Sequence, residues 1–245
     1  MSKIAHKLSF YATPPHACSY LSDQQAITLF ADPGFPKNGQ LYSALLGNGF
    51  RRSGEHLYQP YCNGCSACIP VRIPVNQFRP SRNQVRTWKR NQDIAVRPLA
   101  AGYHQQHFEL YQRYLAARHE GGGMDNPAPE SYMDFLTASW ADTRFCEMSL
   151  DNKLLAVAIV DRVDNALSSV YTFFDPDYSS RSPGKFAILY SINEARKSGL
   201  TWLYLGYWIA GCRKMNYKNE YQPVEYFIDG KWRSHSDKVE SLFAR

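Results

Sequence analysis

One stretch organises the chain, and it reads Tyr58-Gln-Pro-Tyr-Cys62-Asn-Gly-Cys65-Ser-Ala-Cys68-Ile-Pro-Val-Arg72-Ile. A second stretch follows shortly after it and reads Phe78-Arg-Pro-Ser-Arg82-Asn-Gln-Val-Arg86-Thr-Trp88-Lys-Arg90. No Asp or Glu occurs between Glu55 and Asp93, so positive charge is concentrated in this part of the chain. Regularly spaced cysteines followed by arginines are not typical of a packed core. We expect a polyanionic partner.

The three cysteines of the first stretch can present thiolates to one metal ion or cluster, because a Cys-x-x-Cys loop turns its two sulfurs towards a common point. A tetrahedral site needs a fourth ligand, for which Cys18 is the first candidate, ahead of His56 and His16. The spacing does not separate zinc from an iron-sulfur cluster. The alternative is a set of reduced, half-buried thiols. The predicted structural metal site consists of Cys18, Cys62, Cys65 and Cys68.

The arginines of the second stretch have helical spacing. Arg82, Arg86 and Arg90 are four residues apart, so in a helix they lie on one face. Such a row of guanidinium groups suits the phosphates of a nucleic acid. Trp88 and Phe78 either offer surfaces for base stacking or form the edge of the core.

Composition limits the class of protein. The 245 residues are 44 % hydrophobic and 14 % aromatic, which suffices for one large or two ordinary folded domains. The net charge of +6 is clustered beside aromatic residues, which favours a nucleic-acid partner over a merely solvated face. There is no run of about 18 apolar residues and no secretory or transit pattern. We therefore expect no membrane association and a cytoplasmic location, where cysteines remain thiols, metal ligands or catalytic groups.

Local patterns predict an α+β fold. Helices are expected after the capping residue Asn38 as far as Gly47, at 103–118 with a stop at Glu120–Met124, and at 131–139. Strands at 145–150, 154–163 and 166–174 favour an antiparallel meander, followed by a helix up to Gly199 and a strand at 202–205. The change of character near residue 95 predicts a basic, cysteine-containing domain over 1–95 and a second domain over 96–245.

The order of elements in the second half resembles the acyltransferase fold of the GNAT class, with a mixed and mostly antiparallel sheet. In that fold the loop before the central helix binds phosphate or pyrophosphate through backbone N–H groups. Here the loop reads Arg181-Ser-Pro183-Gly-Lys185, in which proline and lysine replace smaller or more flexible residues. This departure argues against coenzyme A and favours the phosphate of a terminal nucleotide, with Arg181 and Lys185 as candidates to bind it.

Four further blocks accompany the cysteine stretch: Cys18-Ser-Tyr-Leu21, Gly49-Phe-Arg-Arg-Ser-Gly54, Tyr171-Thr-Phe-Phe-Asp-Pro176 and Gly206-Tyr-Trp-Ile-Ala-Gly-Cys-Arg-Lys-Met-Asn-Tyr-Lys218. With them the chain resembles bacterial aminoacyl-tRNA-protein transferases over nearly its whole length. The similarity is greatest to the aspartate/glutamate leucyltransferases, relatives of eukaryotic arginyl-tRNA-protein transferase. The resemblance implies transfer of leucine from leucyl-tRNA to the α-amine of proteins beginning with Asp or Glu, which creates a signal for degradation.

Such a reaction needs neither ATP nor a catalytic cofactor, because the aminoacyl ester is already activated. We expect Arg51 or Arg52 to bind the acceptor carboxylate, since arginine binds carboxylates bidentately. Asp175 is either the proton acceptor or amine-orienting group, or a turn residue before Pro176. The other candidates are Tyr204 and Tyr207 near the ester, Lys214 and Lys218 at the tRNA acceptor end, Cys212 in chemistry or packing, and Cys146 in the core.

Three alternatives stay open at this point. Arginyl-tRNA is an alternative donor, because the residues do not identify the donor pocket. A CoA-dependent N-acetyltransferase would fit the fold but not the basic residues or the weak pyrophosphate loop. A metal-stabilised RNA-binding module would explain cysteines and charge but not the acyltransferase-like half. The sequence also does not indicate an oligomeric state.

Overall fold

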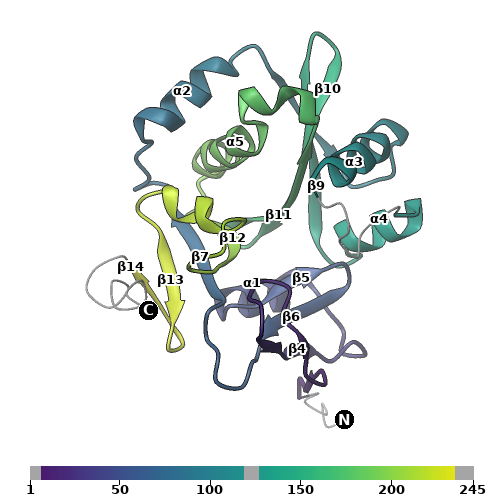
Figure 1. The fold of residues 1–245 in the computed structure, drawn as a ribbon, viewed down its shortest axis with the longest axis vertical. Helices are drawn as coiled ribbons and strands as arrows, with labels where there is room; N and C mark the ends of the chain where they lie inside the picture. Colours follow the sequence, from purple (N-terminus) through teal and green to yellow (C-terminus); the bar gives the residue numbers. More distant parts are fainter. Residues whose placement is uncertain (1–6, 119–126, 235–245) are drawn as a thin grey trace, which may run out of the picture.

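An eight-stranded sheet forms the larger part of the structure (Figure 1), a computed structural model that describes residues 7–118 and 127–234. Its strand order is β14-β13-β7-β12-β11-β10-β9-β8. Among the described strands, the pair β11 and β12 is parallel and the other pairs are antiparallel. The strands are β7 (Ile69–Pro74), β8 (Ala95–Ala100), β9 (Asp142–Leu150), β10 (Lys153–Val163), β11 (Ala166–Phe174), β12 (Trp202–Trp208), β13 (Glu225–Ile228) and β14 (Lys231–Ser234).

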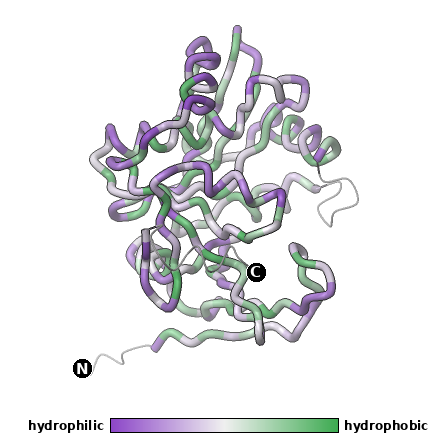
Figure 2. Tube along the Cα trace, turned by 60° about the vertical axis from the view of Figure 1, so that its left-hand side comes forward, coloured by the Kyte–Doolittle hydropathy of each residue, from purple (hydrophilic) through white to green (hydrophobic). Residues whose placement is uncertain are grey.

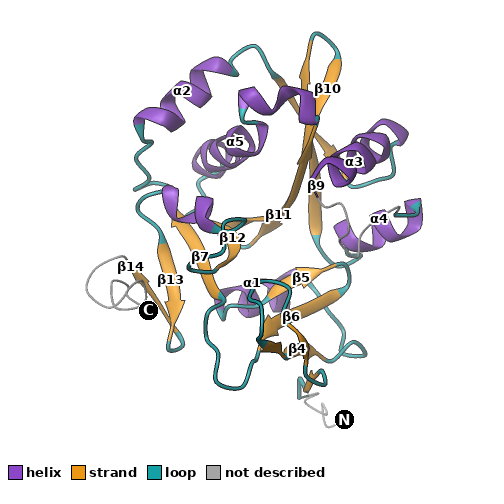
Figure 3. Ribbon diagram, viewed as in Figure 1, coloured by secondary structure: helices purple, strands orange, loops and turns teal. Residues whose placement is uncertain are grey.

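Helices cover both faces of this sheet, as the ribbon in Figure 3 shows. On β10, Ala156 and Ala158 pack with residues of α5 (Pro183–Lys197), near Trp88 of α2 (Arg82–Arg90). The alternate residues Val157 and Ile159 face α3 (Gln105–Arg118) and α4 (Pro129–Leu136). Successive residues of a strand point to opposite faces, so β10 is buried on both sides. The predicted strands at 145–150, 154–163 and 166–174 are confirmed.

A second sheet, in the order β1-β4-β6-β5, lies below the first in Figure 1. Its strands are β1 (Phe10–Ala12), β4 (Thr28–Ala31), β5 (Arg51–Ser53) and β6 (His56–Pro60), with the short pair β2 (His16–Ala17) and β3 (Gln25–Ala26) beside them in sequence. Helix α1 (Gly39–Gly47) packs its buried residues between the two sheets. Figure 2 shows hydrophobic residues interspersed with hydrophilic ones along the chain in both regions.

The predicted cap at Asn38 is confirmed, and the structure adds a second cap at the start of α2. The Asn38 side chain accepts a hydrogen bond from the Leu41 N–H at 2.8 Å at the start of α1. Ser81 and Gln84 form a reciprocal capping box at the start of α2. The stop predicted at Glu120–Met124 lies outside the residues that the structure describes. Two short 3₁₀ helices, η1 (Pro176–Arg181) and η2 (Asn216–Glu220), complete the described elements.

The predicted boundary at residue 95 does not separate the two sheets. Strand β7 lies between β13 and β12 of the larger sheet, although it directly follows the cysteine stretch in sequence. Helix α2 packs near α5 on the same sheet. The N-terminal segment thus contributes both a small sheet and one central strand of the large sheet. Across residues 7–118 and 127–234, no helix has the length and apolar character needed to span a membrane.

Candidate active site

The two parallel strands of the large sheet separate at the centre of the molecule. Register between β11 and β12 covers Ala166 to Ser168, paired with Trp202 to Tyr204, although both strands continue well beyond this point. The next backbone group on β11, the Ser169 carbonyl, accepts a hydrogen bond from Nη2 of Arg51. A buried carbonyl that leaves the ladder needs such a partner. The separation of the strands therefore places the Arg51 guanidinium between them.

Lys218 of η2 approaches the same place from the other side. Strand β12 has an irregularity between Tyr204 and Gly206, and Gly206 has a φ of +83°, which favours glycine. A Cβ atom at Gly206 would lie 3.4 Å from Arg51 Nε and 3.6 Å from Lys218 Nζ. Both cations thus converge on one glycine. Arg51 is 8 % exposed and Lys218 is 6 % exposed.

This pair of cations lacks a compensating anion. Lys218 Nζ donates to the Tyr207 carbonyl at 2.6 Å, whereas Nη1 of Arg51 has no hydrogen-bond partner among the described residues. No described carboxylate forms a salt bridge with either side chain within the ranges 7–118 and 127–234. Burial, and then the nearby Arg51 guanidinium, lower the pKa of Lys218 to about 7. An entering carboxylate would compensate both positive charges, so the arrangement is suited to bind an anion.

Tyr207 lies beside this cation pair, since its carbonyl accepts from Lys218. Its hydroxyl donates towards the Gly49 carbonyl at 3.0 Å and the Tyr58 carbonyl at 3.2 Å, and burial raises the pKa of Tyr207 strongly. Tyr207 is therefore a neutral residue that holds β12 against the small sheet. Tyr204 has a different neighbour, since its hydroxyl accepts from Nη1 of Arg72 at 3.2 Å. The structure does not bring the two tyrosines to one reacting group.

Arg52 is not available to an acceptor, which corrects one of the two arginine predictions. Its Nε lies 2.6 Å from Oδ2 of Asp161 and its Nη2 lies 2.7 Å from Oδ1, with both side chains fully buried. Tyr42 and Thr143 donate to the same carboxylate at 2.8 and 2.7 Å. Neighbouring residues of a strand point to opposite faces, so Arg52 completes this buried network while Arg51 enters the strand separation.

Asp175 acts as a turn and capping residue. Its carboxylate accepts from the Asp177 N–H at 3.1 Å and caps η1 directly after β11. It also pairs with Arg113 at 3.3 Å and with Lys153 at 3.4 Å. The hydrogen bonds and ion pairs of Asp175 within the described residues do not include Arg51 or Lys218, and its role as proton acceptor or amine-orienting group stays a prediction. The turn alternative agrees with the observed contacts.

The predicted tRNA-binding residues fall into three groups. Arg82, Arg86 and Lys214 are exposed, so their charges are available to a polyanion. Arg90 donates to the Ser180 carbonyl at 2.5 Å and remains exposed. Lys218 is buried and therefore does not belong to a phosphate-binding surface. The other two are engaged in ion pairs, Arg181 with Asp93 at 2.8 Å and Lys185 with Glu220 at 2.9 Å.

The thiols of the cysteine stretch lie close enough to influence one another. Burial, and after it the thiols of Cys18, Cys62, Cys65 and Cys212, raise the pKa of Cys68 to about 12. Cys212, which is distant in sequence, thus joins the predicted set. As the side chains are placed, however, the described part of the chain contains no group of three His, Cys, Asp or Glu residues that could hold a metal ion. His56 instead packs edge-on against Phe30, and His16 contacts the Pro14 carbonyl.

Two family models match the chain. "Arginine-tRNA-protein transferase, N terminus" covers residues 16–86, which include Arg51 and the cysteine stretch. "Arginine-tRNA-protein transferase, C terminus" covers residues 106–228, which include the strand separation and Lys218. The fold and the site thus belong to a transferase. The chain is a member of the arginine-tRNA-protein transferase family.

Relatives within the family are similar over almost their full lengths. The chain is 50 % identical over 232 residues to "Aspartate/glutamate leucyltransferase" of Pseudomonas fluorescens (strain Pf0-1), covering 95 % of this chain and 98 % of the relative. It is 51 % identical over 225 residues to the protein of that name from Hahella chejuensis (strain KCTC 2396), covering 92 % and 96 %. Among solved structures, "The structure of L-PGS from Bacillus licheniformis" aligns with a TM-score of 0.49 and 9 % identity, covering 73 % of this chain and 63 % of that one.

Proposed function

We propose that this enzyme transfers leucine from leucyl-tRNA to the α-amine of proteins that begin with Asp or Glu. The observation that carries this proposal is the buried cation pair of Arg51 and Lys218, with which no carboxylate in residues 7–118 and 127–234 forms a salt bridge, at the place where two strands separate. The relatives' name indicates an acidic acceptor and leucine as the transferred residue. The product carries an N-terminal leucine, which marks the protein for proteolysis. A cytoplasmic location agrees with free thiols and a tRNA substrate.

The reaction is an acyl transfer between two bound substrates. The neutral α-amine attacks the ester carbonyl carbon, a C–N bond forms, and the C–O bond to the tRNA ribose breaks. The amine loses one proton and the ribose oxygen gains one. The ester supplies the activation, so the protein mainly holds amine and ester in contact. Backbone groups released from the ladder between β11 and β12 can hold polar parts of the substrates there.

The cation pair would recognise the acidic side chain of the acceptor. A carboxylate between Nη1 of Arg51 and Nζ of Lys218 satisfies the unpartnered donor and compensates both charges. An amide side chain of similar shape would leave both cations uncompensated. The exposed Arg82, Arg86 and Lys214 would hold tRNA phosphates away from this buried site.

We further propose that the large sheet has a GNAT-like arrangement. Strands β9, β10 and β11 form an antiparallel meander, α5 follows, and β12 returns parallel to β11 for a short length before separating. Arg181 and Lys185 at the start of α5 are engaged with Asp93 and Glu220. We therefore place the bound ester near the strand separation and not at this loop.

Transfer assays test the reaction directly. Leucyl-tRNA and arginyl-tRNA, each labelled in the amino acid, are incubated with peptides that begin with Asp, Glu or Ala. We expect leucine to be incorporated into the Asp and Glu peptides, and neither amino acid into the Ala peptide. Incorporation of arginine alone would establish the other donor. Binding of both tRNAs without transfer by folded protein would contradict the proposal and favour the RNA-binding alternative.

A structural metal in the cysteine cluster is a separate proposal, and no step of the transfer depends on it. As placed, the thiols do not form a coordination sphere, so binding requires Cys18, Cys62, Cys65 and Cys68 to rotate towards one point. We expect protein isolated without oxygen to hold about one zinc ion or cluster. Cys65→Ser should lower the metal content measured by elemental analysis, whereas Cys146→Ser, in the core, should not. Metal-free wild-type protein from zinc- and iron-supplemented cells would contradict the proposal.

A further inference from the structure

One face of the small sheet carries a row of side chains that crosses all four strands. The register pairs Tyr11 with Phe30, Phe30 with Tyr58, and Tyr58 with Arg51. Residues directly opposite each other on neighbouring strands lie on the same face. Three strand spacings make this row roughly 14 Å long. Three aromatic residues therefore lead from the open edge of the sheet to the cation pair.

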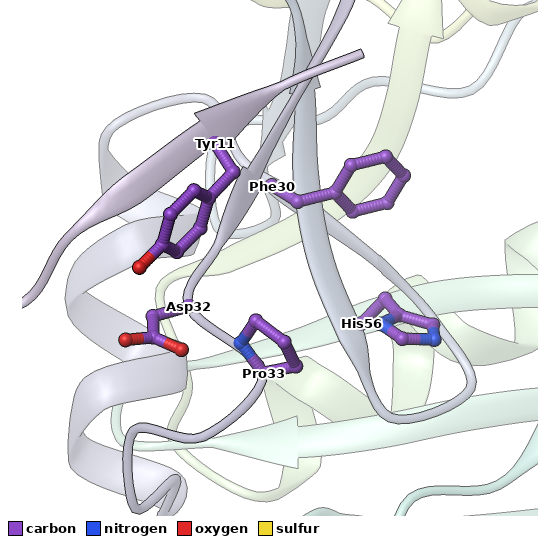
Figure 4. A pocket seen from close by; sticks show the side chains of 5 residues that line it. All are labelled: Tyr11, Phe30, Asp32, Pro33 and His56. Atoms are coloured by element: carbon purple, nitrogen blue, oxygen red, sulfur yellow. The ribbon is translucent and has the colours of Figure 1, made fainter.

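The outer end of this row is hollowed. A cavity of about 530 Å³ is lined by Tyr11, Phe30, Asp32, Pro33 and His56, and Figure 4 shows their side chains around it. Its size lies within the usual range for ligand pockets. Tyr11 is 56 % exposed, and the rings of Phe30 and His56 are 5.8 Å apart at an interplanar angle of 76°. The pocket thus offers accessible aromatic faces.

Polar groups are placed at one side of these aromatic faces. Oδ1 of Asp32 accepts from the Gly34 N–H at 2.8 Å, which fixes the carboxylate and leaves Oδ2 to accept from a ligand. His56 contributes a ring nitrogen on the other side of Pro33 (Figure 4). Lys37 Nζ donates to the Pro33 carbonyl at 2.9 Å, so a cation lies at the rim. If the ligand of this pocket were an aliphatic side chain, it would form no favourable contact with the Asp32 carboxylate or the Lys37 ammonium group.

The geometry points to a binding site for an unpaired nucleobase that carries an exocyclic amino group, close to the 3′ end of the tRNA. The base would stack on Tyr11 and Phe30, its amino group would donate to Asp32, and Lys37 would contact the adjoining phosphate. Four-stranded sheets with exposed aromatic residues bind single-stranded RNA in this way in other folds. The inference rests on the proposed function, because it requires tRNA as the donor.

The row of Tyr11, Phe30, Tyr58 and Arg51 also shows how one RNA strand could place a base in the pocket and its terminal ester near the separation of β11 and β12. Tyr58 is half-buried between the two ends, and its ring lies 6.2 Å from that of Tyr207. The same sheet face is therefore continuous from the pocket to the residues around Arg51. A single strand that follows this face would bring its terminal ester towards the separation of β11 and β12, beside the acceptor bound at the cation pair, with an earlier base in the pocket.

Binding of an uncharged RNA minihelix to the full chain tests the inference without requiring transfer. The minihelix ends either in single-stranded CCA or in a blunt stem. We expect the double variant Tyr11→Ala/His56→Ala to weaken binding of the CCA form on the order of tenfold and to leave binding of the blunt form unchanged. Tyr103→Ala removes an exposed tyrosine elsewhere and should change neither. Circular dichroism would establish that all variants remain folded.

Abasic substitutions then identify the bound position. An abasic nucleotide that weakens wild-type binding should have no further effect on the double variant, because both changes remove one contact. Equal affinity of wild type and double variant for the CCA form would overturn the inference. A raised KM for the acceptor peptide with unchanged minihelix binding would also overturn it and assign the pocket to the acceptor protein. If the wild-type protein transfers no leucine, that result would instead count against the proposed function, whatever the minihelix shows.

Discussion

Lys218→Met and Arg51→Met should each raise the KM for a peptide beginning with Asp by about 100-fold. Each change leaves the acceptor carboxylate with one buried cation in place of two, and loss of one partner in a buried charge pair costs roughly 2–5 kcal/mol. The KM for leucyl-tRNA should change much less, because both side chains are buried away from the exposed arginines of α2. Steady-state kinetics with each substrate varied in turn makes the measurement.

Lys214→Met is the matched control for this prediction. Lys214 is exposed and lies four residues before Lys218, so its replacement removes the same charge without entering the buried site. It should raise the KM for tRNA and make tRNA binding less dependent on salt concentration than in wild type, while the acceptor KM stays unchanged. An acceptor KM that is equal in wild type and Lys218→Met would contradict the assignment of the cation pair.

A pH series gives a second test of the same pair. The pKa of Lys218 is about 7 when no acidic ligand is bound, owing first to burial and then to Arg51, while Cys212 and Cys68 act in the opposite direction. Lys218 is therefore charged below this pH and neutral above it. The acceptor KM of wild type should rise as the pH passes upward through this value, because a neutral lysine binds a carboxylate less well. Lys218→Met should lack that component of the rise.

Local sequence patterns predicted most of the elements but not how distant parts pair. The cap at Asn38 and the meander of β9, β10 and β11 depend on signals within a few residues, including the turn at Asp151-Asn152, where both residues have positive φ. The position of β7 between β13 and β12 depends on contacts with strands more than a hundred residues later. A short apolar run after a cysteine stretch contains no information about that partner.

The same distinction explains the results for the candidate site. Strand alternation alone indicates that Arg51 and Arg52 face opposite ways, but the anion at Asp161 that occupies Arg52 is over a hundred residues away. The spacing of Lys214 and Lys218 predicts that both contact tRNA, and only the tertiary structure shows that Lys218 is buried beside Gly206. Cys212 lacks a neighbouring cysteine in sequence that would have indicated its place near Cys68. The pocket around Tyr11 likewise arises from strand pairing.

Arg52→Met should lower the free energy of unfolding by roughly 3–5 kcal/mol. The change leaves the fully buried Asp161 carboxylate without its bidentate partner, and an uncompensated buried charge is strongly destabilising. Urea unfolding followed by circular dichroism measures the effect. Arg97→Met provides the matched control, because Arg97 pairs with Glu147 but its side chain is 71 % exposed, so its loss should cost about 1 kcal/mol or less.

The paired variant Arg52→Met/Asp161→Leu separates lost charge balance from lost packing. Removing both charges together should restore a large part of the stability, since apolar pairs often replace buried ion pairs without loss. The Thr143 hydroxyl would then lose its Asp161 acceptor and the Tyr42 hydroxyl would keep only Ser168, so recovery should be incomplete. A folded double variant should keep the acceptor KM of wild type, because Arg51 on the other face of β5 remains in place. A KM raised as far as in Arg51→Met would show that Arg52 also determines acceptor binding.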